Sequence, residues 1–324
     1  MTATVLRDAA AFMARLVRQE RIALRSEIDT MESDYLASAM AAGDSALVIA
    51  VRTTRLVADA QARHGCGPTV TAALGRLLTG AALMGSSLTG RDRIALQVTG
   101  DGPVRRLTAE AMTGGRVRGY PQQPDVDVPL NAQGKFDVAR LVGRGSLHVT
   151  RTFSDFQPYT SAVRLISGEI GEDLAHYFAS SEQIPTIVAV GVLAGPSGVL
   201  ASGGLLLQLL PGADEATIRD LEARAHALPA VRGMIREGAP PEALIEAYAG
   251  ALSPRATGTH EVQFACPCDR DRVVKALLGL GRPTLESMIA EDDETEARCD
   301  FCGDVYRFSR AELRDIVASA TTSA

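Results

Sequence analysis

Four cysteines near the C-terminus place the tightest constraint on what this chain can fold into. Cys266 and Cys268 flank a single proline, and Cys299 and Cys302 form a second close pair after thirty intervening residues. Two short turns joined by a loop of this length can direct four thiolates to one tetrahedral zinc ion. Gly303 follows the second pair and permits the tight backbone that such a turn needs. The sequence therefore predicts one four-cysteine zinc site.

The segment around these cysteines is too small to be stable on its own core. We expect a zinc-binding domain at residues 258–324, in which the acidic run 291–296 faces solvent. Domains of this size rarely bury enough apolar surface to fold without a metal or a disulfide. Zinc occupancy is therefore predicted to decide whether this domain is folded. Its predicted apolar anchors are Val273, Leu277, Leu280, Leu285, Ile289, Tyr306 and Phe308.

The residues alone leave three roles open for the four cysteines. A closed all-thiolate site is usually inert, which favours a static zinc module acting as an adaptor or a transcription accessory. Each pair is also close enough to oxidise to a local disulfide, which would eject the metal and make the site a switch. A dithiol oxidoreductase would need one pair with a lowered pKa and no tightly bound metal.

The fifth cysteine, Cys66, stands alone before a predicted helix start. A helix dipole at that position can lower the pKa of a thiol. No other metal-ligand pattern surrounds it, because the histidines show neither metal nor catalytic spacing. We expect Cys66 to be incidental to the site.

Composition limits the compartment and the partners. The chain has 324 residues, 46% hydrophobic and 22% charged, which suits one substantial core and a smaller module. A net charge of -6, with 4% aromatic residues and no Trp, disfavours a nucleic-acid surface. The N-terminus lacks the apolar region of a secretory signal, and the most apolar stretches are interrupted by Arg or turn residues. We expect a cytoplasmic protein that does not engage membranes.

The fold class predicted for the larger part is α+β. Strand-like runs at 46–54, 93–112, 141–153 and 186–210 enclose turn sequences at 100–103 and 195–198, which favours antiparallel hairpins. Two helical stretches fall between them. Thr69–Gly85 is rich in small residues and is expected to be buried, whereas Gly168–Gln183 is amphipathic, with Ile170, Leu174 and Phe178 on one face.

These patterns predict four parts in sequence. Residues 1–33 form a helical extension, 34–211 a large mixed sheet and helix domain, 212–257 a helical linker, and 258–324 the zinc-binding domain. In the linker, Asp214 is a plausible N-cap, and Pro240, Pro241 and Gly250 bracket a second helix. The apolar stripes of these linker helices are thin, so we expect a small buried area and low stability.

Several kinds of chemistry have no motif in the chain. Lys135 is followed by Phe136 and Lys275 by Ala276, so no Gly-Lys-Ser/Thr phosphate loop is present. No Gly-x-Ser-x-Gly elbow and no dinucleotide fingerprint occurs. The acids at 169–173 are explained more simply by the dipole of the helix that they open. We therefore expect neither an enzyme nor a nucleotide-driven machine.

Together these features resemble the redox-regulated thirty-three-kilodalton chaperonin family, the HslO heat-shock holdases. The two cysteine pairs match that family's Cys-x-Cys and Cys-x-x-Cys zinc motif, and Ser167–Pro185 is similar to its most recognisable core segment. Leu141–His148 and Gly100–Arg105 are similar to its strand motifs. The resemblance covers about Asp34 to Ser309 and leaves the N-terminal extension as a departure.

The resemblance implies a specific function. In such proteins the reduced, zinc-bound form is inactive. Oxidation joins Cys266 to Cys268 and Cys299 to Cys302, releases the zinc, unfolds the linker and exposes a surface for unfolding client proteins. The oxidised form is a homodimer, and the stress response needs no ATP. The expected cofactor is one Zn²⁺ in the reduced form, and the expected partners are unfolded or partly unfolded proteins.

Overall fold

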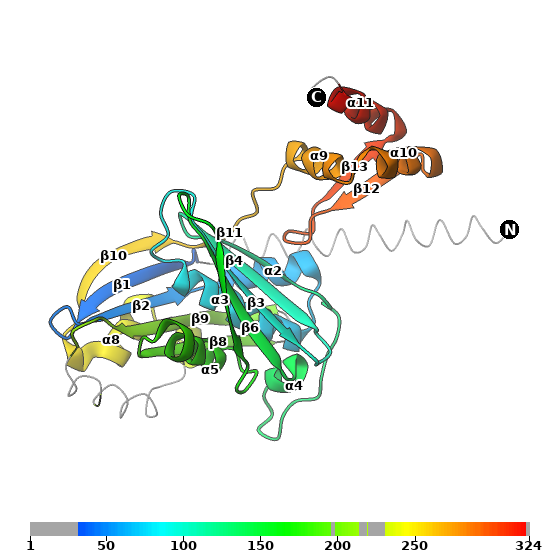
Figure 1. Ribbon diagram of the computed structural model, residues 1–324. Helices are drawn as coiled ribbons and strands as arrows, with labels where there is room; N and C mark the ends of the chain where they lie inside the picture. Colours follow the sequence, from blue (N-terminus) through cyan, green and yellow to red (C-terminus); the bar gives the residue numbers. More distant parts are fainter. Residues whose placement is uncertain (1–31, 196–197, 214–218, 220–230, 322–324) are drawn as a thin grey trace. The chain divides into compact units, whose positions relative to one another are not determined.

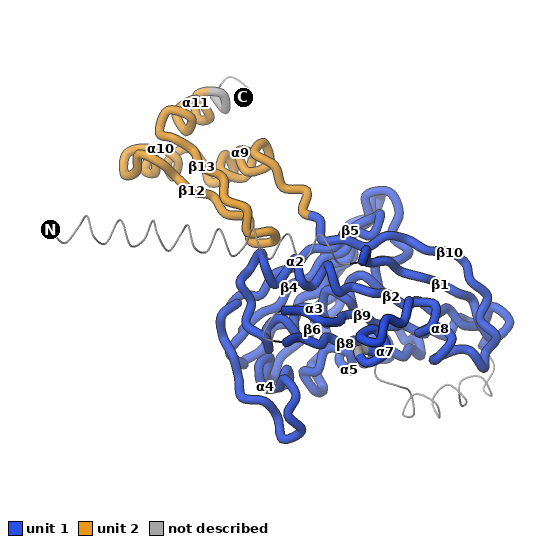
Figure 2. The backbone as a smooth tube through the Cα atoms, turned by 180° about the vertical axis from the view of Figure 1, so that it is seen from behind, with its two compact units in different colours: residues 1–265 blue, residues 266–324 orange. Residues whose placement is uncertain are grey.

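The structure, a computed structural model, describes residues 32–195, 198–213, 219 and 231–321 (Figure 1). The chain divides into two compact units between Ala265 and Cys266 (Figure 2). Most of the predicted N-terminal extension, residues 1–31, lies outside the described residues, as does the proposed N-cap Asp214. In the part of the chain that is described, no helix is long and apolar enough to cross a membrane.

One sheet of unit 1 holds five strands among the described residues, all paired antiparallel. Their order across the sheet is β10-β1-β2-β9-β8. Near-continuous runs of Ala, Val and Leu form the central strands because both faces of this sheet are covered. The bounds are β1 Tyr35–Ala41, β2 Ala46–Arg52, β8 Thr186–Gly195, β9 Gly198–Leu209 and β10 Arg255–Glu261.

The second sheet of unit 1 holds six strands among the described residues, in the order β11-β5-β4-β3-β6-β7. All neighbours are antiparallel except β11 and β5. The predicted turn at 100–103 is confirmed, since it joins two strands that pair antiparallel. The predicted turn at 195–198 includes residues 196–197, which lie outside the described residues, and the strands on either side of it pair antiparallel as expected. The bounds are β3 Arg93–Gly100, β4 Arg106–Met112, β5 Arg116–Pro121, β6 Gly145–Thr152, β7 Tyr159–Arg164 and β11 Gln263–Phe264.

Helix α3 (Pro68–Met84) lies against strands of both sheets and forms the centre of the main core. It corresponds to the helix predicted at Thr69–Gly85, and nearly all of its side chains are buried, as expected. Small residues allow the close approach of its neighbours. A Cβ added at Gly80 would lie 2.5 Å from Cδ1 of Leu174. The α+β fold class is therefore confirmed, with the small-residue helix as its centre.

Helix α2 (Thr54–His64) was not predicted from the sequence. The strand expected at 46–54 ends at Arg52, and the helix begins at Thr54. Its start is set by contacts from distant parts of the chain. Oδ2 of Asp34 accepts a hydrogen bond from the Leu56 amide at 2.7 Å. The hydroxyl of Thr53 bonds that of Ser202 at 2.9 Å. Such long-range capping leaves no local signature in the sequence.

The helix predicted at Gly168–Gln183 is confirmed as α5 (Gly171–Tyr177), which continues into the π-helical turn η1 (Phe178–Glu182). Ile170, Leu174 and Phe178 are buried, as their spacing predicted. The strand expected at 141–153 begins later, at Gly145, because α4 (Val138–Val142) occupies the start of that range.

The helix predicted between Pro240 and Gly250 is α8 (Pro241–Ala249), which follows the shorter α7 (Val231–Arg236). Both pack on the five-stranded sheet and form a second core there. Leu244 and Ile245 of α8 are buried, at 0% and 5% exposure. The expectation of a small buried area is wrong for α8. Its narrow stripe of apolar side chains packs on the apolar face of β1 and β2 and is buried there.

Unit 1 also continues beyond residue 257, where the sequence analysis placed the start of the zinc-binding domain. Strand β10 pairs with β1 (Figure 1), and β11 pairs with β5, so both belong to the sheets of unit 1. The charged sequence of β10 suits an outer strand with exposed side chains. The compact division consequently falls at residue 266.

Unit 2 contains the hairpin of β12 (Glu294–Arg298) and β13 (Val305–Ser309) with helices α9 (Arg270–Gly279), α10 (Arg282–Glu291) and α11 (Arg310–Thr321). The buried residues of its apolar core, among the described residues, are Leu277, Leu285, Phe308 and Leu313. Leu280 is 52% exposed, so its prediction as an anchor is wrong; it follows the last turn of α9 and faces solvent. A core of this size agrees with the expectation that unit 2 needs further stabilisation.

Candidate metal centre

The two cysteine pairs occupy different local structures in unit 2. Cys266 and Cys268 lie in the extended segment just before α9, whose N-cap Asp269 accepts a hydrogen bond from the Arg272 amide at 2.8 Å. Cys299 and Cys302 lie in the turn between β12 and β13. One pair is thus fixed by a helix start and the other by a hairpin turn.

The hairpin turn has the tight backbone that the sequence predicted. The amide of Gly303 donates to the carbonyl of Cys299 at 2.8 Å, and the amide of Cys299 donates to the carbonyl of Asp304 at 2.9 Å. Gly303 has a φ of 73°, a conformation that favours glycine. These bonds orient the side chains of Cys299 and Cys302 toward the same side.

The four sulfur atoms converge. Each Sγ lies within 4.8 Å of the other three. The Sγ atoms of Cys266 and Cys299 are 3.8 Å apart, and those of Cys268 and Cys302 are 3.1 Å apart. A disulfide needs about 2.0 Å between sulfurs, so the four side chains are thiols here. The structure therefore brings together all four residues that the sequence singled out.

This arrangement fits a tetrahedral zinc ion. With a zinc–sulfur bond of about 2.3 Å, sulfurs at the corners of a tetrahedron are about 3.8 Å apart. The separation of Cys266 and Cys299 equals that value, and that of Cys268 and Cys302 is shorter. Soft thiolates also select zinc over the hard cations that prefer oxygen ligands. A divalent cation at this position would bind the four sulfurs and offset half of the charge of four thiolates.

The surroundings of Cys299 and Cys302 favour the protonated form of these two thiols. Burial raises the pKa of Cys302 and of Cys299 above the ordinary value for a thiol. The hydroxyl of Tyr306 donates a hydrogen bond to Sγ of Cys268 at 3.3 Å, and this bond raises the pKa of the tyrosine. Tyr306 was expected only as an apolar anchor, so its contact with a sulfur is a feature that sequence reasoning missed.

Cys66 lies in unit 1, outside the cysteine cluster. Burial raises its pKa to about 12, so the side chain stays a thiol at neutral pH. The idea that the helix dipole of α3 lowers this pKa is therefore wrong, since desolvation outweighs it. The structure agrees with the expectation that Cys66 is incidental to the site.

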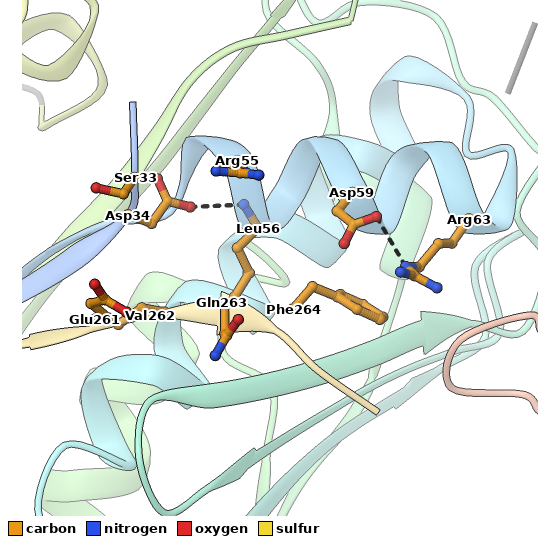
Figure 3. Close-up of a pocket in the computed structure, with 10 residues that line it drawn as sticks. All are labelled: Ser33, Asp34, Arg55, Leu56, Asp59, Arg63, Glu261, Val262, Gln263 and Phe264. Atoms are coloured by element: carbon orange, nitrogen blue, oxygen red, sulfur yellow. Dashed lines mark hydrogen bonds and ion pairs between the residues drawn. The ribbon is translucent and has the colours of Figure 1, made fainter. Parts of the chain in front are cut away.

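A second polar site lies in unit 1, in a pocket of about 420 Å³ (Figure 3). Asp34 lines it with Asp59, Arg63 and Phe264. Arg63 pairs with Asp59 at 3.0 Å and lies 4.9 Å from the centroid of the Phe264 ring. Within the described residues, Oδ1 of Asp34 is buried without a hydrogen-bond partner. Nothing in the sequence indicated this pocket, because an aspartate before a strand is an ordinary start signal.

The fold and the cysteine cluster define a class of protein. It combines a two-sheet α+β unit built around a central buried helix with a small unit in which four clustered thiols could hold a metal ion. A solved structure of the same kind is the 33 kDa chaperonin (heat shock protein 33 homolog) of Thermotoga maritima. Its TM-score is 0.83 at 35% sequence identity, and the match covers 90% of this chain and 100% of that one.

Sequence comparisons agree. The family profile described as Hsp33 protein matches residues 34–309. The 33 kDa chaperonin of Shouchella clausii is 41% identical over 289 residues, which cover 89% of this chain and 98% of that protein. The 33 kDa chaperonin of Bacillus subtilis is 40% identical over 285 residues, or 87% and 98% of the two chains. This chain belongs to the Hsp33 family of chaperones.

Proposed function

We propose that this protein is a redox-regulated, ATP-independent holdase that binds unfolding proteins and prevents their aggregation under oxidative stress. The observation that carries the proposal is the convergence of four thiols within 4.8 Å in a unit with a small core. Membership of a family whose relatives are named chaperonins supports the choice of activity. We place the protein in the cytoplasm, where thiols are kept reduced until stress.

The proposed trigger is the oxidation of the two cysteine pairs. In each pair two thiols lose two electrons and two protons and form one disulfide, while hydrogen peroxide is reduced to water or hypochlorous acid to chloride and water. We assign the bonds as Cys266 to Cys268 and Cys299 to Cys302. Four neutralised sulfurs no longer bind a cation, so the metal leaves.

The pairing within each motif follows from chain connectivity. In the folded unit, sulfurs of different pairs lie as close as 3.1 Å, so distance alone does not select the local bonds. Once the first bond forms and the metal leaves, the small core no longer holds the two turns together. Cysteines two or three positions apart then meet far more often than those thirty apart, because a shorter loop closes at a lower entropic cost.

Loss of the metal is proposed to unfold unit 2 and then to loosen residues 212–257. Helix α8 is the part of this linker whose release matters most, because its removal would uncover the apolar face of β1 and β2, including Ala37 and Ala39. Such newly exposed apolar surface holds unfolded chains by the same burial that drives folding, so no nucleotide is required. We further propose that the oxidised form is a homodimer.

Client aggregation tests the proposal. The zinc-loaded protein is compared before and after hypochlorous acid treatment, without nucleotide, for suppression of the light scattering of a chemically unfolded client. We expect suppression only after oxidation, reversal by a dithiol reductant, and local disulfides in a peptide map. A static zinc module would keep its metal through the oxidant and suppress nothing. A dithiol oxidoreductase would turn over a disulfide substrate without zinc.

A further inference from the structure

Strand β7 leaves one edge of the six-stranded sheet open among the described residues. Its ladder with β6 shows which groups are unpaired. The Leu165 amide donates to the Gly145 carbonyl at 3.0 Å, and bonded pairs recur at every second position of an antiparallel ladder. The backbone N–H and C=O groups that face away from β6 therefore belong to Thr160, Ala162 and Arg164.

Strand β7 lacks the features that usually protect an edge from pairing. Outer strands commonly carry charges, a proline or a bulge. The only charged residue of β7 is Arg164 at its end, and its register with β6 has no shift. By contrast, β10 at the edge of the other sheet has charged residues at both ends and a register shift against β1. Strands β7 and β10 are thus built differently.

Exposed apolar side chains flank β7 at both ends. Phe156 is 75% exposed, Tyr159 46% and Ile166 60%. The rings of Phe156 and Tyr159 both pack on Phe153, with centroid distances of 6.3 Å and 6.2 Å. Single exposed apolar residues are ordinary, but a group of them around an unpaired strand marks an interaction surface. We call residues 156–166 the β7 edge.

We propose that the β7 edge is a docking site for an extended segment of an unfolded polypeptide, which adds to the sheet as a further strand beside β7. The proposal rests on the proposed holdase function and gives it a binding surface. Backbone bonds to Thr160, Ala162 and Arg164 are independent of the client's sequence, and the flanking apolar side chains bury those of the client.

The size of the β7 edge favours an extended chain over a second folded copy. A standard interface between folded proteins takes about 20–30 residues on each side. The β7 edge offers a single strand and its flanks, which is what one extended peptide needs in strand addition. The lack of charge along most of β7 also suits clients of varied sequence.

Matched substitutions test the backbone contacts. Ala162→Pro removes an N–H that faces away from β6, so the existing ladder is kept, whereas Ala162→Val retains that N–H. The probe is carboxymethylated α-lactalbumin, a permanently unfolded polypeptide. For the oxidised protein we expect Ala162→Pro to weaken probe binding by about tenfold, the effect of losing one backbone hydrogen bond, and Ala162→Val to leave it within about twofold.

A second pair of variants tests the apolar contacts without altering the strand. Phe156→Ser is expected to weaken probe binding, and Leu130→Ser, which removes a side chain that is 56% exposed elsewhere, to leave it unchanged. Both side chains are mostly exposed, so neither change should unfold the protein. Probe binding by Phe156→Ser equal to that of wild type would contradict the proposal.

Amide hydrogen exchange reads the site directly in the wild-type protein. With the probe, exchange should slow at Thr160, Ala162 and Arg164 and stay as it was at Ser161 and Val163, which already bond β6. Unchanged exchange at the three outward amides overturns the β7 edge while leaving aggregation suppression, and thus the holdase function, intact. If exchange at these amides instead slows without the probe, and slows further as the protein concentration rises, the β7 edge binds a second copy of this chain. That result also overturns the proposal.

Discussion

Sγ of Cys268 lies 3.1 Å from Sγ of Cys302, although 34 positions separate the two residues. One residue precedes α9 and the other follows β12, so this contact joins the beginning of unit 2 to its hairpin. A metal held there would fasten the two parts of a unit whose own apolar core is small. Structural zinc contributes about 10 kcal/mol or more to coupled folding, which exceeds what such a core supplies.

Removal of one thiol is the first prediction. Cys302→Ser should abolish stoichiometric zinc binding and leave unit 2 unfolded, because Cys302 is the most buried of the four cysteines. Cys66→Ser should keep one zinc per chain, since Cys66 lies outside the cluster. Elemental analysis of the purified variants gives the answer. Full zinc content in Cys302→Ser would show that this residue is not a ligand.

Metal removal should act on the two units differently. A strong chelator applied to the reduced protein should speed amide exchange throughout unit 2, including Leu285 and Phe308 in its core. The amides of α3 should remain protected, because that helix is buried in the separate core of unit 1. Exchange measured residue by residue would contradict this account if unit 2 stayed protected after the zinc had gone.

The small core of unit 2 predicts a sensitive position. Leu285 is 1% exposed, so Leu285→Ala should destabilise unit 2 by about 2–5 kcal/mol. Leu280 is 52% exposed, and Leu280→Ala should cost less than about 0.5 kcal/mol. The denaturant midpoint of unit 2 measures both changes. Equal midpoints for the two variants would be inconsistent with the buried position of Leu285.

The buried carboxyl group of Asp34 should make the free energy of unfolding of unit 1 depend on pH. Burial raises its pKa from 3.8 to about 7, so between these values the folded protein binds a proton that the unfolded chain has lost. This difference in proton binding stabilises the folded protein fully below about pH 4, and the stabilisation is lost as the pH rises through about 7. Asp34→Asn cannot ionise and still offers an oxygen to the Leu56 amide.

The free energy of unfolding of Asp34→Asn, relative to wild type, should therefore be higher at pH 8 than at pH 4. Denaturation curves of both proteins at the two pH values measure this difference. An offset that does not change with pH would mean that the carboxyl group of Asp34 has an ordinary pKa in the folded protein.

Local patterns allowed much of the structure to be predicted. The small residues of Thr69–Gly85 indicated a buried helix, and α3 is that helix. The two cysteine pairs indicated a common site, because each pair brings two thiols close together along the chain and one tetrahedral metal ion takes four. In both cases the information lies within a few neighbouring residues.

Long-range pairing could not be predicted in the same way. Strand β10 has a charged, exposed sequence that resembles a linker, and only its ladder with β1 assigns it to unit 1. Helix α2 starts where the distant Asp34 caps it. Helix α8 has only a narrow stripe of apolar side chains, but these are buried because the face of the sheet that they contact is also apolar. Each of these outcomes depends on a partner that lies far away in the sequence.

The most direct test of the redox switch is a single time course of oxidation. Zinc-loaded protein is treated with hypochlorous acid, and zinc release, free thiols and client holding are measured in the same samples. We predict that one zinc leaves per chain, that four thiols disappear with it, and that client holding rises with the zinc release. Holding that is already complete in the zinc-bound protein, or zinc that stays bound while holding appears, would contradict the switch.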